Sequence, residues 1–68
     1  MNEIVYRVPG MHCDRCTAVV EEELSRVVGV ASVHAELESK LVTVRGEGLA
    51  DEALRAAIDE AGYEAARP

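Results

Sequence analysis

The spacing of apolar side chains along this 68-residue chain switches between a two-residue and a 3.6-residue period, and this succession restricts the fold most. Residues 3–8 alternate, with Ile4, Tyr6 and Val8 on one face, which predicts a half-buried strand ended by Pro9-Gly10. Residues 14–28 then show helical spacing, and Gly29 is expected to stop that helix. The apolar positions at that spacing are Cys16, Val20, Leu24, Val27 and Val28.

The second half of the chain repeats the order. Residues 30–37 and 41–44 alternate, and the three residues between them are short enough for a hairpin. Residues 50–61 predict a second helix, and residues 63–66 a short last strand. The order strand, helix, strand, strand, helix, strand predicts an α+β, ferredoxin-like fold, with a four-stranded antiparallel sheet and both helices on one face. No linker interrupts the pattern, so residues 1–68 are expected to form a single domain.

Composition narrows the function classes. The chain has no Trp or Phe, so its core must be built from Val, Leu, Ile and Ala, and we expect no large cavity for an organic substrate and no enzyme activity. The net charge of −6 disfavours nucleic acid and anionic membrane surfaces as partners and favours a protein with a basic patch. Neither a targeting segment nor an apolar run of roughly 18 residues is present, which predicts a cytoplasmic protein with reduced thiols.

Both cysteines of the chain lie in the stretch Gly10-Met11-His12-Cys13-Asp14-Arg15-Cys16, at the predicted strand-to-helix turn. Two thiols at this spacing converge on one point, and the positive end of the helix favours their thiolate forms. Thiolates are soft ligands that select Cu(I), so the pair predicts a copper site open to a third ligand from outside. Zn(II) fits less well, because it usually takes four ligands and the two cysteines with His12 provide at most three.

Other interpretations of Cys13 and Cys16 stay open at this point. The pair could serve a thiol oxidoreductase, but such dithiols are usually found on a thioredoxin-type scaffold, which this element order does not predict. The two residues could also be inert, although a turn with charged residues between the cysteines is an odd place for structural thiols.

On these residues the chain resembles the heavy-metal-associated domains, a family that includes soluble copper chaperones and the N-terminal modules of metal-exporting P-type ATPases. The matching segments are Gly10–Cys16, Gly29–Val33 and Ala61–Tyr63. The resemblance implies that Cys13 and Cys16 bind Cu(I). It further implies transfer by ligand exchange to the metal-binding domain of a P-type copper ATPase or to a copper repressor. A metal-bridged homodimer and an excised ATPase module are the open alternatives, and the positions of Met1 and Pro68 favour a free-standing chaperone.

The resemblance also implies roles for three neighbours of the cysteines. Met11 matches a family methionine that turns inward beneath the loop, so we expect it in the core. Tyr63 matches a tyrosine of bacterial chaperones that shields the metal, although it could equally cover the end of the core. His12 departs from the family, which most often has Thr or Ser there. Its imidazole either reaches the metal or faces solvent.

Several other charged or titratable residues are expected to serve the fold or to face solvent. Asp14 is expected to cap the first helix or to complement its dipole. His34 is expected to be a solvated sheet residue. Residues 21–23, all glutamate, are expected to form a solvated helix face and the acidic half of a docking surface.

Overall fold

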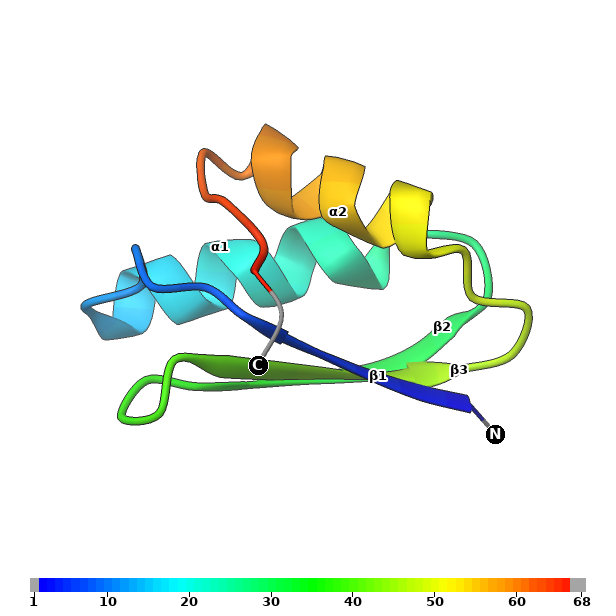
Figure 1. Ribbon diagram of the computed structural model, residues 1–68, viewed down its shortest axis with the longest axis horizontal. Helices are drawn as coiled ribbons and strands as arrows, with labels where there is room; N and C mark the ends of the chain where they lie inside the picture. Colours follow the sequence, from blue (N-terminus) through cyan, green and yellow to red (C-terminus); the bar gives the residue numbers. More distant parts are fainter. Residues whose placement is uncertain (1, 67–68) are drawn as a thin grey trace.

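The computed structural model describes residues 2–66, in which two helices cover one face of an antiparallel sheet (Figure 1). Met1 and Pro68, used above for the chaperone prediction, lie outside the described residues. The elements are β1 (Asn2–Arg7), α1 (Asp14–Ser25), β2 (Val30–Glu36), β3 (Leu41–Gly46) and α2 (Asp51–Glu60). β3 is the central strand, and it pairs antiparallel with both β1 and β2. No helix in the described part is long and apolar enough to cross a membrane.

The predicted last strand is reduced to a single bridge. Arg7 and Ala66 exchange two backbone hydrogen bonds of 2.8 Å each, which place the end of the described chain beside β1 (Figure 1). The amide of Tyr63 instead donates to the carbonyl of Ile58 and closes the end of α2. Among the described residues, the C-terminal segment therefore pairs with β1 only at Ala66, and the sheet that they form has three strands.

The core lies between the sheet and the helices, as the periodicity predicted. Tyr6 and Val8 of the first segment point into it, and the opposite side of the sheet faces solvent. Met11, expected in the core, is fully buried, and Cys16 is nearly so at 7% exposure. The complete set of buried apolar residues in the described part of the chain is Tyr6, Val8, Met11, Cys16, Val20, Leu24, Val42, Val44, Leu54, Ala57 and Ile58.

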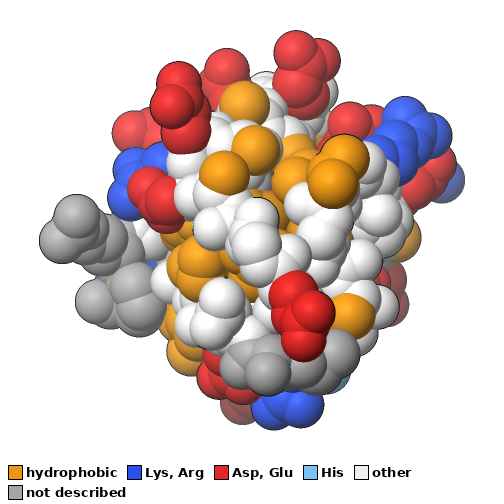
Figure 2. Space-filling model, turned by 90° about the vertical axis from the view of Figure 1, so that its right-hand side faces the viewer, with side chains coloured by type: hydrophobic (Ala, Val, Ile, Leu, Met, Phe, Trp, Pro, Cys, Tyr) orange, Lys and Arg blue, Asp and Glu red, His pale blue; other side chains and the backbone are white. Residues whose placement is uncertain are grey.

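The first helix is shorter than its apolar pattern suggested. It ends at Ser25, and Val28, assigned above to its apolar face, is 92% exposed. The reason lies in the following turn, where Gly29 adopts a φ of +94° and reverses the chain before β2. Figure 2 shows this end of the molecule, which carries the α1–β2 and β3–α2 loops and displays apolar side chains among acidic ones.

The three glutamates of α1 have partners on the helix and on the sheet. The carboxylate of Glu21 accepts a hydrogen bond of 3.1 Å from the backbone N–H of Ala35 and so ties α1 to the edge of β2. Glu22 and Glu23 both pair with Arg26, at 3.0 and 3.5 Å. At 1.5 Å per residue, Glu21 also lies about 12 Å along the helix from Cys13. One arginine serves two of the three glutamates and Glu22 stays 66% exposed, so the face remains acidic and the docking surface predicted there remains a prediction.

Candidate metal centre

The segment that carries the cysteines joins β1 to α1, and two of its first residues are packed in the core. Val8 and Met11 are fully buried, and the amide of Met11 donates to the carbonyl of Val8 at 3.1 Å. His12 and Cys13 are exposed immediately after this anchor. The core therefore holds the base of the loop in place while its tip remains accessible.

The start of α1 brings the two sulfurs together. Cys13 is the N-cap residue, and its carbonyl accepts the amides of Cys16 and Thr17 at 3.0 and 3.3 Å. Asp14 follows in the first turn, where its charge complements the dipole, but it is not the cap. One turn of helix separates the cysteines, and their Sγ atoms lie 2.9 Å apart in a hydrogen bond. Cys13 is exposed and Cys16 is buried, so a partner can approach only the first sulfur directly.

Cys16 is an acidic thiol. Its pKa is lowered to about 6, first by the hydrogen bond from Cys13, then by the Tyr63 hydroxyl and the backbone N–H of His12. Each of these donors stabilises the thiolate. The sequence pattern attributed the effect to the helix N-terminus, and the structure adds these hydrogen bonds as further causes. These hydrogen bonds favour the thiolate form of Cys16 at neutral pH.

Tyr63 reaches the loop from the segment that follows α2. Its hydroxyl bonds Cys16, and the thiolate in turn raises the pKa of Tyr63. The ring also lies against Gly10, where an added Cβ would sit 3.1 Å from Cδ1 of Tyr63. Gly10 thus leaves room for the ring, a role that the sequence alone could not indicate because it depends on a contact with a residue far along the chain.

His12 lies close enough to complete a cluster with the two cysteines. One ring nitrogen of His12 and the two Sγ atoms all lie within 4.8 Å of one another. The same ring donates from Nδ1 to the carbonyl of Gly10 at 2.8 Å. Two sulfurs and one imidazole form a donor set suited to a soft or borderline cation.

We expect Tyr63→Phe to raise the pKa of Cys16 above its value of about 6. Loss of the hydroxyl removes one donor to the thiolate, so protonation of that sulfur becomes easier and persists to higher pH. An anaerobic pH titration of thiolate ultraviolet absorbance measures the shift. Tyr6→Phe is the matched control, because the Tyr6 hydroxyl donates to Asp51 and not to a cysteine. An unchanged midpoint in Tyr63→Phe would refute the assignment.

Comparison with known proteins finds a matching family and several similar proteins. The family described as "Heavy-metal-associated domain" matches residues 5–64. The chain is 32% identical over 66 residues to the copper chaperone CopZ of Staphylococcus aureus, covering 94% of this chain and 97% of that protein. It is also 35% identical over 68 residues to copper-transporting ATPase 1 of Mus musculus, covering 97% of this chain. The match spans only 5% of the length of that ATPase.

A solved structure agrees with the sequence matches. A CopZ metallochaperone superimposes with a TM-score of 0.89 at 30% identity, covering 94% of this chain and 98% of the other. This match confirms the predicted ferredoxin-like arrangement. CopZ, a relative matched over nearly its full length, is a chaperone, and this likeness supports the expectation that the chain is not an enzyme.

Proposed function

Because the chain belongs to the heavy-metal-associated domain family, we propose that it binds Cu(I) through Cys13 and Cys16 and passes the ion to another protein. The observation that carries this proposal is the paired arrangement of the two sulfurs. They lie 2.9 Å apart at a helix start, one buried with a lowered pKa and the other exposed. The copper chaperone relatives support copper as the cargo.

The difference between the two cysteines suggests an order of events. The exposed Cys13 meets the incoming ion first, and Cys16, whose lowered pKa favours its thiolate, then holds the ion against the core. Any thiol proton still present is released to solvent when both sulfurs bind the ion. Because thiolates prefer soft cations, Cu(I) is favoured over the harder divalent metals.

Release can proceed by ligand exchange at the exposed sulfur. A thiolate of the acceptor forms a bond to Cu(I), the bond from Cu(I) to Cys13 breaks, and the Cys13 thiolate takes up the proton that the acceptor thiol gave up. A second acceptor thiolate then replaces Cys16 in the same way. No electron is transferred, and the ion is bound by sulfur throughout.

The acceptor in this proposal is the metal-binding domain of a P-type copper ATPase or a copper-responsive repressor. A second copy of the chain, sharing the ion between two loops, is the alternative. We place the protein in the cytoplasm, where reducing conditions keep both thiols available. The same site would also serve a module within a P-type ATPase.

An anaerobic titration tests the proposal. We expect about one Cu(I) per monomer to be retained against a strong Cu(I) chelator, because two thiolates hold it. Mixing the loaded protein with a second Cys-x-x-Cys domain should move the ion faster than the chelator alone can extract it. If no Cu(I) is bound but the pair cycles between dithiol and disulfide with a thiol substrate, the oxidoreductase alternative replaces this function.

A further inference from the structure

We propose that His12 is a third ligand of the bound cation, through Nε2, so that the loop forms a site of one imidazole and two thiolates. This inference builds on the proposed function, since it concerns the same loop and the same cysteines. It assigns a specific task to the residue at which this chain departs from the family's usual Thr or Ser.

The first observation concerns the protonation of the imidazole. A carbonyl oxygen can only accept a hydrogen bond, so the 2.8 Å contact between Nδ1 of His12 and the oxygen of Gly10 places the proton on Nδ1. In the neutral ring, Nε2 then carries the free lone pair. Histidines that bind metals usually hold their other ring nitrogen in this way, donating to a backbone carbonyl or a carboxylate. The ring is therefore already in the tautomer that a metal at Nε2 needs.

The second observation is distance. With metal–sulfur bonds of about 2.3 Å and metal–nitrogen bonds of about 2.0–2.1 Å, a sulfur and a nitrogen at 120° lie about 3.8 Å apart. One ring nitrogen of His12 and the two Sγ atoms lie within 4.8 Å of one another, so small side-chain rotations bring the imidazole and the sulfurs to this spacing. His12 and Cys13 are exposed and can make these rotations without disturbing the core.

The third observation is the spacing of the two sulfurs. A linear ion bound only by the cysteines would need the Sγ atoms about 4.6 Å apart, whereas a trigonal ion needs only about 4.0 Å for the same bond length. The sulfurs lie 2.9 Å apart, and the Cys16 side chain is packed in the core. A trigonal site therefore requires less opening of the loop, and it requires a third donor, which His12 can provide.

A third nitrogen ligand changes which cations the loop accepts. Imidazole suits Zn(II) and similar borderline ions, whereas most of the affinity for Cu(I) comes from the thiolates. We therefore expect His12 to allow a Zn(II) complex that the cysteine pair would hold poorly. Mutation of a residue that hydrogen-bonds to a metal ligand typically lowers metal affinity about 10–100-fold. Loss of the ligand itself should therefore lower the affinity at least about 10-fold.

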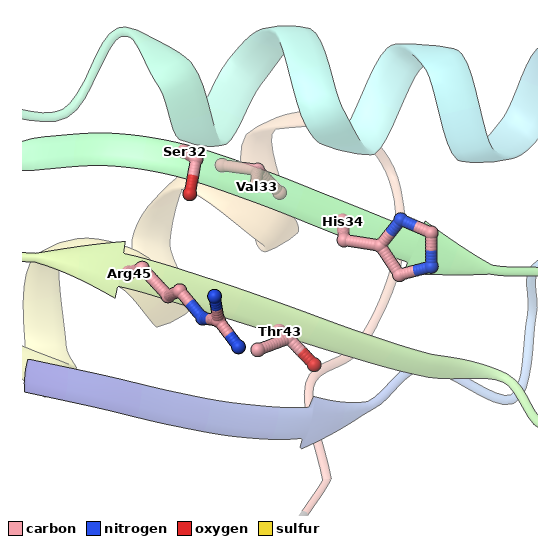
Figure 3. A pocket seen from close by; sticks show the side chains of 5 residues that line it. All are labelled: Ser32, Val33, His34, Thr43 and Arg45. Atoms are coloured by element: carbon pink, nitrogen blue, oxygen red, sulfur yellow. The ribbon is translucent and has the colours of Figure 1, made fainter.

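The test measures Zn(II) binding at one fixed pH in the wild type and two variants. His12→Ala should weaken Zn(II) binding at least about 10-fold, and should change Cu(I) retention against a chelator much less. His34→Ala is the matched control, because His34 lies on β2 beside Thr43 and Arg45, on the open face of the sheet (Figure 3). It should bind Zn(II) like the wild type.

Nitrogen-15 NMR of the labelled histidines gives a readout independent of affinity. One equivalent of Zn(II) should shift the Nε2 resonance of His12 and leave that of His34 in place. An unshifted His12 ring, with unchanged Zn(II) affinity in His12→Ala, overturns the third ligand while Cu(I) binding by the cysteines still stands. Wild-type protein that binds neither ion overturns both the proposed function and this inference.

Discussion

The Cys13→Ser/Cys16→Ser variant is expected to retain no Cu(I) against a strong chelator while keeping its fold. A serine hydroxyl is a hard donor that stays protonated at neutral pH, so it cannot replace a thiolate toward a soft ion. Cys13 is exposed, and Cys16 is one of eleven buried apolar residues in the described part of the chain. Burial of one hydroxyl costs about 1–3 kcal/mol, which the remaining core residues should tolerate.

Two measurements decide this prediction. Anaerobic Cu(I) titration should fall from about one equivalent to none, and far-ultraviolet circular dichroism without metal should match that of the wild type. The single variant Cys13→Ser shows how much Cu(I) Cys16 retains by itself, because it removes the sulfur of Cys13 and with it the thiol that bonds Cys16. An unfolded double variant would mean that the loop contributes more to stability than its position suggests, as in zinc fingers, which need metal to fold. Cu(I) retained at full stoichiometry would exclude the cysteines as the ligands.

Gly46→Ala is expected to cause a large loss of stability. A Cβ at Gly46 would lie 2.0 Å from the oxygen and 2.9 Å from the carbon of the Gly29 carbonyl. That carbonyl cannot move aside easily, because it accepts the amide of Glu47 at 2.9 Å. The clash is between backbone segments, so we expect a loss of about 2–4 kcal/mol in the free energy of unfolding. A domain of this size has only about 3–10 kcal/mol in total.

Urea denaturation of Gly46→Ala and Gly48→Ala measures this effect against a matched control. Gly48 has a φ of +65° with no atom within 4 Å of an added Cβ, so its substitution costs only backbone strain, about 1–2 kcal/mol. Equal losses in the two variants would show that the backbone relaxes around the new methyl group. Both glycines lie at the end of the sheet away from the β1–α1 loop (Figure 1), so Cu(I) binding by the folded fraction should be unchanged.

The sequence by itself determined the order of the elements, the buried faces and the family. These features depend on local periodicity and on a short motif, and both are visible in neighbouring residues. The alternation that buries Tyr6 and Val8 and the helical spacing that buries Val20 and Leu24 were predicted correctly. The pairing of Cys13 with Cys16 also follows from their separation by one helical turn.

Only the tertiary structure decided the features that depend on residues far apart in the chain. Tyr63 helps to lower the pKa of Cys16, and Gly10 leaves room for its ring. Glu21 binds the edge of β2, which no helical pattern could indicate. In each case the contact forms only when the fold brings distant segments together. Neither residue's sequence neighbours therefore indicate it. Periodicity predicts which face of a helix or strand is buried, and the three-dimensional fold determines which atoms that face contacts.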